Sequence, residues 1–401
     1  MLRRFGWGEL CLLPVMAALT SCASYTAGNG DVVADVYVQT SPNTWEADPS
    51  IPASTLAFRA DSHGNLTPVK TPWGSETLVA AGQGMVFTSD YSSGAIHRYA
   101  VGQDGTASGP VSTLHPAKYD STACAPPWGT GMLDPTGTYL TVELKGQSCD
   151  VWQTFQLEAG GGYKFLGEDD SGQWVFRDGE VYMGFAGESE MSADGRFAYG
   201  VGGEGAGGSF LAAMKRDSSG VLRIWNNFDW PFDTQYRYQP GGPSTDGNNH
   251  VAMLMAGSTS ANGGQTWLAS FSIDPATGNL EPISTYDNMP QTIDESYGAA
   301  FSPLGDTVAV GGMGFLETFL YHADGPATPA ATLKLPGESL QGFAWDKSHH
   351  LYVLTSTDPK PPAIARFSLY VFTVTDGQFT PAPGSPWNVP NGRSLVVVPR
   401  G

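Results

Sequence analysis

Positive charge is scarce in this chain. Its 401 residues include 20 Lys and Arg against 39 Asp and Glu, for a formal net charge of −19. Binding to a phosphate backbone needs a basic footprint, so no nucleic-acid partner is expected. Charged residues of either sign make up only 15% of the chain, whereas glycine (51) and proline (29) are plentiful. Many turn formers and few helix formers indicate an all-β fold.

Long apolar runs are lacking beyond the N-terminal segment. Arg3 and Arg4 precede the apolar residues 11–19, a stretch of signal-peptide length that is too short to cross a bilayer as a helix. The stretch closes on residues 19–22 (LTSC), which resemble the bacterial lipobox. This resemblance implies that Cys22 is lipidated and becomes the new N-terminus.

The predicted organisation is a signal peptide at 1–21, a tether at 22–32 and one domain at 33–401. The alternative is an ordinary signal peptide cut near Ala23 or Ala27, which would leave a periplasmic protein. We therefore expect an exported monomer, either an outer-membrane lipoprotein with the membrane as partner or a periplasmic protein.

Cysteine is rare, with four residues in the whole chain. Cys11 and Cys22 lie in the signal region, which leaves Cys124 and Cys149 on either side of a predicted hairpin. In an oxidising compartment this pair is a disulfide candidate, worth about 3 kcal/mol through loop entropy. The alternative is two buried thiols. Neither cysteine has the spacing of a zinc ligand.

Two kinds of turn alternate along the chain. The first occurs at 133–137 (LDPTG) and 301–305 (FSPLG), and the second at 214–220 (MKRDSSG) and 271–278 (FSIDPATG). Asp or Ser opens each turn and Gly supplies the positive φ near its end, as hairpins require. The units repeat every 35–50 residues or so, about the size of a four-stranded propeller blade.

The repeats predict a seven-bladed β-propeller of four-stranded antiparallel blades. The blades are predicted at 33–70, 74–115, 127–168, 174–228, 248–286, 296–335 and 338–385. The segment 394–399 (SLVVVP) has no hairpin partner of its own, so we expect it to be the innermost strand of blade 1. That pairing would close the ring and remove its open sheet edges. Six or eight blades remain alternatives, since blades 1 and 4 are irregular.

The paired motifs at 271–286 (FSIDPATGNLEPISTY) and 299–310 (AAFSPLGDTVAV) resemble those of YVTN-repeat, lactonase-like seven-bladed propellers. This group includes bacterial 6-phosphogluconolactonase, and the resemblance covers about residues 33–399. It implies the fold and, as one activity, lactone hydrolysis. The family pattern has a His before the turn of a middle blade, where this chain has Glu188 and Glu190. This departure counts against phosphogluconolactonase activity.

Residues that enter the inner strands of a propeller surround the mouth of its channel. Six such residues are candidate catalytic groups, the glutamates as general base and the others to orient a substrate: Glu188, Glu190, Glu295, Glu338, His250 and Arg393. Glu76 lies at a similar entrance. Converging carboxylates would hold Ca²⁺ or an amine-bearing ligand. The favoured alternative is a solvated acidic ring without ligand or cofactor, because no EF-hand spacing is present.

The segment 225–243 is the longest insertion that does not repeat. Its candidate ligand or partner surface consists of Trp230, Phe232, Tyr236, Arg237 and Tyr238. The same residues would equally seal the gap between blades 4 and 5.

Taken together, the residues favour a non-catalytic ligand- or protein-binding or scaffold propeller in the cell envelope. A lactone hydrolase is the alternative.

Overall fold

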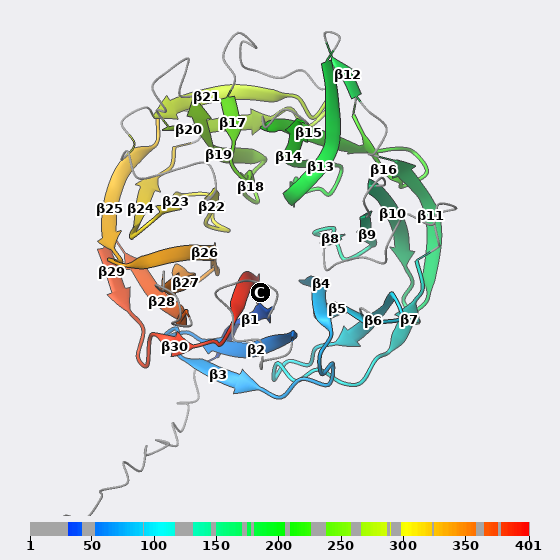
Figure 1. The fold of residues 1–401 in the computed structure, drawn as a ribbon, viewed down its shortest axis with the longest axis horizontal. Helices are drawn as coiled ribbons and strands as arrows, with labels where there is room; N and C mark the ends of the chain where they lie inside the picture. The colour runs from blue at the N-terminus through cyan, green and yellow to red at the C-terminus, as the bar shows by residue number, and fades with distance from the viewer. Residues whose placement is uncertain are drawn as a thin grey trace, which may run out of the picture.

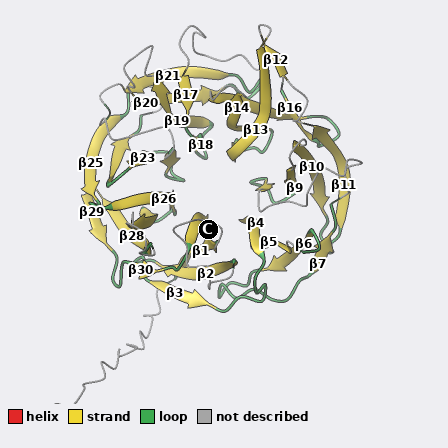
Figure 2. Ribbon diagram, in the orientation of Figure 1, coloured by secondary structure: helices red, strands yellow, loops and turns green. Residues whose placement is uncertain are grey.

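The computed structural model describes residues 31–41, 53–90, 92–116, 131–145, 150–170, 175–177, 180–204, 209–225, 238–257, 266–286, 289, 298–322, 325–357, 365–375 and 378–400. Within these ranges the chain forms seven antiparallel sheets, arranged as blades around a ring (Figure 1). Figure 2 shows strands joined by loops throughout. No helix in the described part is long and apolar enough to cross a membrane. The predicted all-β, seven-bladed propeller is therefore confirmed.

The first three blades have four strands each, which follow one another from the channel outward. Blade 1 consists of β31 (Gly392–Pro399), β1 (Val32–Thr40), β2 (Ser54–Asp61) and β3 (Leu66–Val69). Blade 2 consists of β4 (Thr77–Gly82), β5 (Met85–Asp90), β6 (Ala95–Ala100) and β7 (Ser112–Leu114). Blade 3 consists of β8 (Gly131–Leu133), β9 (Tyr139–Lys145), β10 (Asp150–Leu157) and β11 (Tyr163–Asp170).

Of the other four blades, blade 6 keeps this pattern, and blades 4, 5 and 7 each carry one additional short strand. Blade 4 has β13 (Glu180–Met191), β14 (Phe197–Glu204), β15 (Ser209–Arg216) and β16 (Leu222–Ile224), with β12 (Val175–Arg177) paired to β13. Blade 5 has β17 (Tyr238–Pro240), β18 (Ser244–Thr245), β19 (His250–Gly257), β20 (Thr266–Ile273) and β21 (Leu280–Tyr286). Blade 6 has β22 (Ala299–Phe301), β23 (Thr307–Gly312), β24 (Phe315–Leu320) and β25 (Thr328–Lys334). Blade 7 has β26 (Glu338–Trp345), β27 (His350–Thr357), β28 (Phe367–Thr375) and β29 (Gln378–Pro381), with β30 (Trp387–Asn388) paired to β28.

Blade 5 begins earlier in the chain than the repeats predict. Its innermost position is shared by two short strands, β17 and β18, which both pair with β19. Residues 241–243 (GGP) separate the two strands, and Pro243 has no N–H to donate to β19. The end of the predicted 225–243 insertion is thus part of the inner strand, and the predicted start at 248 is wrong.

The C-terminal strand closes the ring as predicted. β31 pairs antiparallel with β1, with Val397 opposite Val36 and Leu395 opposite Val38. Just beyond β31, Arg400 reaches Asp35 on β1, with Nε 2.8 Å from Oδ2 and Nη2 2.9 Å from Oδ1. The same guanidinium donates to the carbonyl oxygens of Gly102 and Gln103 in blade 2. One side chain therefore joins the closing strand to two blades.

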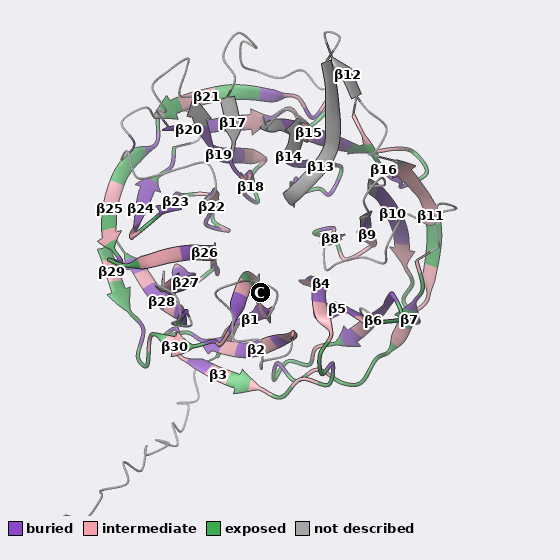
Figure 3. Cartoon of the chain, viewed as in Figure 1, coloured by how far each residue is buried: buried purple, intermediate pink, exposed green. Residues whose placement is uncertain are grey.

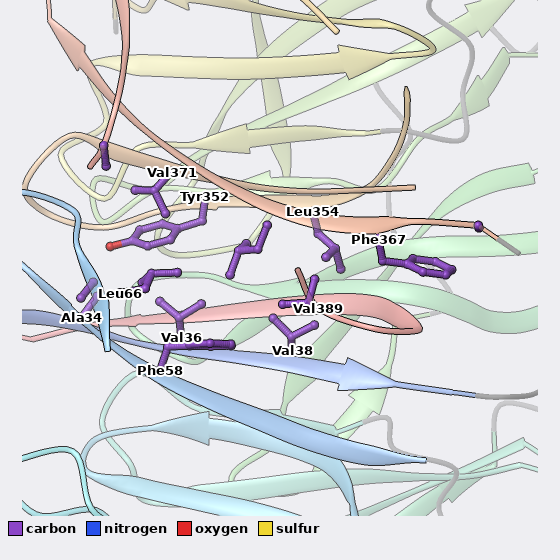
Figure 4. Close-up of a cluster of buried hydrophobic side chains, with 14 residues drawn as sticks. Ala34, Val36, Val38, Phe58, Leu66, Tyr352, Leu354, Phe367, Val371 and Val389 are labelled. Atoms are coloured by element: carbon purple, nitrogen blue, oxygen red, sulfur yellow. The ribbon is translucent and has the colours of Figure 1, made fainter. Parts of the chain in front are cut away.

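The hydrophobic core lies between neighbouring blades. Along β1, Val36 and Val38 face blade 7, whereas Tyr37 faces blade 2, because successive side chains of a strand point to opposite faces. Figure 4 shows Val36 and Val38 beside Tyr352 and Leu354 of blade 7. Each fully buried side chain of this size contributes about 1.5–3 kcal/mol. Exposed residues are concentrated on the outermost strands (Figure 3).

Acidic turn residues hold the hairpins together, as the repeats predict. In the turn between β15 and β16, the Asp217 carboxylate accepts hydrogen bonds from the backbone N–H of Ser219 at 2.8 Å and of Val221 at 3.1 Å. Arg223 Nε donates to the same carboxylate at 2.7 Å. Burial alone would raise the pKa of Asp217, but these hydrogen bonds outweigh it and lower the pKa to about 2.

Candidate functional site

The two ends of the ring carry different features. We call the end where the innermost strands begin the leading end, and the end with the inner hairpin turns the turn end. Glu76, just before β4, and Glu338, the first residue of β26, are at the leading end. His250 directly follows the turn between β18 and β19, which places it at the turn end. The predicted grouping of His250 with the glutamates is therefore not what the structure shows.

His250 instead stabilises its turn. The Asp246 carboxylate accepts the backbone N–H of His250 at 2.7 Å, and its other oxygen lies 2.7 Å from His250 Nδ1. Asp346 and His350 repeat this arrangement in blade 7, at 3.0 and 2.8 Å. In each turn the residue before the histidine has positive φ, 64° at Asn249 and 59° at His349. An Asp that bonds its own turn in this way is a structural device.

Glu338 is held within its own blade at the leading end. Tyr370 of β28 donates its hydroxyl to Oε1 at 2.6 Å, and Thr355 of β27 donates its hydroxyl to Oε2. Arg366 Nη2 lies 3.7 Å from Oε1, but this arginine is 68% exposed. We call the glutamate with its threonine and tyrosine donors a leading-end brace, because it ties the first residue of the inner strand to the next two strands.

Blade 2 has the same brace around Glu76. Thr88 of β5 donates its hydroxyl to Oε2, and the Tyr99 hydroxyl lies 3.3 Å from the same oxygen. His97, also on β6, places Nδ1 2.8 Å from Oε1.

The register of the strands makes the two braces equivalent. Thr88 pairs with His97, and Thr355 pairs with Ser368. A β-bulge follows each glutamate at the same distance, after Leu78 in one blade and after Leu340 in the other. Ser368 of blade 7 therefore occupies the position that His97 has in blade 2.

Both brace tyrosines remain hydrogen-bond donors at neutral pH. Burial, followed by the charge of Glu76, raises the pKa of Tyr99 to about 12. Burial, followed by its hydrogen bond to Glu338, raises the pKa of Tyr370 to about 12. A phenol beside a carboxylate is stabilised in its protonated form, because ionisation would place two negative charges together.

Arg393 lies at the start of the closing strand, also at the leading end. Its Nη1 donates to Gln341 Oε1 at 3.4 Å, and its guanidinium lies 4.9 Å above the Phe367 ring. Both partners belong to blade 7, so Arg393 joins blades 1 and 7. Of the six predicted catalytic residues, Glu338 and Arg393 are thus placed at the same end on neighbouring blades.

The other predicted residues do not join them. Glu190 is exposed on β13, two residues before the inner turn and so toward the turn end. Glu188 lies in an irregular part of β13 and Tyr238 in β17, but their side chains are not described. The remaining predicted residues lie outside the described part: Cys22, Cys124, Cys149, Trp230, Phe232, Tyr236, Arg237 and Glu295. Among the described residues, no cluster of three His, Cys, Asp or Glu side chains has the arrangement of a metal site.

Sequence reasoning missed His97, Tyr99 and Tyr370. A weak signal was present, because His97 and Tyr99 are two residues apart, as are Ser368 and Tyr370, so that each pair shares one face of its strand. Recognising the brace from sequence needs the pairing of three strands, which spacing alone does not give.

Comparisons with known proteins establish the fold and no more. No family profile and no curated protein matches the sequence. A protein from Lactobacillus plantarum has the same fold, with a TM-score of 0.57 at 14% identity over 91% of this chain and 99% of that one. A "putative 6-phosphogluconolactonase" from Bacteroides uniformis gives 0.56 at 13%, over 91% and 99%. A "hypothetical selenium-binding protein" from Sulfolobus tokodaii gives 0.55 at 8%, over 93% of each chain.

Proposed function

We propose that this chain, which has the seven-bladed fold of these propellers, binds a ligand at the leading end of the ring and does not catalyse a reaction. We also propose that Cys22 tethers the protein to the cell envelope. The observation that carries this proposal is the hydrogen bonding of Glu338, both of whose carboxylate oxygens already accept hydroxyl hydrogen bonds from its own blade. A general base needs an oxygen directed at its substrate and a neighbouring group that orients the substrate.

Two other catalytic candidates, His250 and Arg393, support the same proposal. His250 is bound to Asp246 at the turn end, and Arg393 contacts Gln341 and the Phe367 ring. A binding surface does not need a poised base. It needs rigid polar groups on fixed strands, which the braces of blades 2 and 7 provide.

A lactone hydrolase is the second candidate. It is favoured by the shared fold with the protein from Bacteroides uniformis and by the contact between Glu76 and His97, in which a carboxylate orients an imidazole. Propellers of one architecture serve many functions, so the shared fold alone does not decide between the two.

The deciding experiment is hydrolysis of sugar and aliphatic lactones by the purified mature protein. We expect no turnover above buffer. Glu338→Gln and Glu76→Gln are assayed in parallel, with Glu281→Gln as the matched control, because Glu281 is an exposed glutamate on the outer strand of blade 5. Turnover that Glu338→Gln or Glu76→Gln abolishes, and that Glu281→Gln retains, would refute the binding proposal and establish the hydrolase.

The envelope tether has its own test. Cys22→Ser should move the protein from the membrane fraction to the soluble periplasmic fraction, since the acyl chains supply the attachment. Intact-mass measurement of the native protein should show a lipidated N-terminal cysteine and, without reductant, two fewer hydrogens for a bond between Cys124 and Cys149. A native protein that is soluble without detergent and carries no lipid mass would refute the tether.

A further inference from the structure

We infer that Glu76 and His97 form a recognition point for a primary ammonium group, at the leading end where blade 2 faces blade 1. This inference rests on the proposed binding function and names the class of ligand. Its basis is a difference between the two leading-end braces, the presence of His97 in blade 2.

The fold does not need His97. In blade 7 the brace of Glu338, Thr355 and Tyr370 is complete, with Ser368 at the position of His97. The carboxylate in blade 2 likewise has its threonine and tyrosine donors. The histidine is therefore an addition to a structural unit that works without it elsewhere in the same chain.

The bond to Glu76 determines which ring nitrogen of His97 faces solvent. A carboxylate only accepts hydrogen bonds, so Nδ1 carries the proton of the 2.8 Å contact. In the neutral ring, Nε2 then presents a lone pair, and none of the described residues donates a hydrogen bond to it. The side chain of His97 is 21% exposed, which leaves its imidazole within reach of a small ligand.

The local charge selects a cation. Glu338 has Arg366 at 3.7 Å, whereas His97 is the one basic side chain that pairs with Glu76 within the described part of the chain. Asp90, at the end of the same hairpin, adds a second carboxylate that interacts electrostatically with His97. An anionic ligand would face both carboxylates, whereas a cation would compensate them.

An ammonium group suits this site in hydrogen bonding and in charge. One of its N–H groups donates to His97 Nε2, while Glu76, bound to Nδ1 on the other side of the ring, holds the imidazole in the tautomer that accepts this bond and adds its negative charge to the site. Hydrogen bonds between charged partners are about twice as strong as neutral ones. The net charge of −19 also raises the local concentration of cations around the protein.

The test is calorimetric titration of the full mature protein with n-butylammonium at pH 8 and about 0.15 M NaCl, which screens nonspecific attraction. The neutral 1-butanol and the anionic butyrate serve as comparison ligands. His97→Ser gives blade 2 the composition of blade 7, so it should fold normally. We expect it to bind butylammonium about tenfold more weakly than the native protein, as loss of one charge-assisted hydrogen bond implies. Glu281→Gln, which removes a distant exposed charge, should bind within about twofold of the native protein.

Three results would overturn the inference: equal affinity in the native protein and His97→Ser, no butylammonium binding by the native protein, or preferential binding of butyrate. The lactone assay on the same preparations separates this inference from the proposed function. Turnover that His97→Ser abolishes would refute the binding function itself and make His97 the base. Absence of both turnover and ammonium binding would refute the ligand class alone.

Discussion

Arg400 is the residue whose loss should most directly weaken the closure of the ring. The substitution Arg400→Met keeps the length and apolar stem of the side chain but removes the guanidinium that binds Asp35 at 2.8 and 2.9 Å. Burial already raises the pKa of Asp35, and the hydrogen bonds and charge of Arg400 oppose that rise. Without Arg400, the carboxylate is left buried with far less compensation.

The expected loss of stability follows from this geometry. Breaking a buried ion pair by removing one partner costs about 3–5 kcal/mol, and the lower figure applies because Arg400 is 20% exposed. Unfolding entropy of about 2.1 cal/mol/K per residue amounts to about 0.8 kcal/mol/K for a domain of roughly 370 residues. A loss of about 3 kcal/mol therefore lowers Tm by about 4 °C.

The assay is differential scanning calorimetry at pH 7 and pH 4. In Arg400→Met, folded Asp35 binds its proton more readily than the unfolded chain does, so stability falls as pH rises above the unfolded pKa of about 3.8. The loss of Tm should hence be smaller at pH 4. Asp35→Asn combined with Arg400→Met should recover most of the loss at pH 7, because no charge is then left buried.

Arg366→Met is the matched control, since Arg366 is 68% exposed and 3.7 Å from its partner Glu338. It should change Tm by less than about 1 °C. The reasoning is refuted if Arg400→Met costs no more than Arg366→Met, or if the double variant with Asp35→Asn is no more stable than Arg400→Met alone.

Three further substitutions test buried or hydrogen-bonded acids, each by calorimetry. Glu317 is 8% exposed, burial raises its pKa, and its Oε2 has no hydrogen-bond partner among the described residues. Its ionisation therefore lowers stability as pH rises, so Glu317→Gln should raise Tm at pH 7.5 and by less at pH 4. A lower Tm at pH 7.5 would contradict this. Asp217, with its pKa of about 2, contributes stability that is present above about pH 4 and lost as pH falls through 2. Asp217→Asn should thus lower the free energy of unfolding by about 1–2 kcal/mol at pH 6, after allowance for solvent screening, and by much less at pH 2. An equal loss at both pH values would contradict the stabilising role of the Asp217 carboxylate. Tyr370→Phe removes a 2.6 Å hydrogen bond to Glu338 and should lower Tm by about 2–3 °C, for a loss of about 2 kcal/mol, whereas an unchanged Tm would show that the brace contributes nothing.

The fold was largely predictable because its information is local and repeated. Turns such as 133–137 and 301–305 specify their hairpins through residues a few positions apart, and the repeated copies reinforce one another. The closing strand was predictable for the opposite reason, since 394–399 has the composition of an inner strand and no partner nearby in sequence.

The site was much less predictable, because it depends on strand identity and register. A start of blade 5 at 248 puts His250 at the entrance of an inner strand, although β17 and β18 occupy that position. The contact between Glu76 and His97 joins residues 21 positions apart across three strands, through a pairing that includes a β-bulge. No spacing rule in the sequence expresses that geometry.

The pairing of β31 with β1 sets an order of events during folding. Blades 2 to 7 draw their strands from consecutive stretches of chain, so each can form soon after it is synthesised. Blade 1 cannot, because Arg400 and Asp35 are 365 positions apart. Until the last strand arrives, the apolar inner edge of β1 stays open to other chains, and long-range pairing of this kind is slow. The interval before closure is therefore when this protein is most exposed to aggregation, and chaperones that act in that interval would affect its yield more than any interaction in the finished ring.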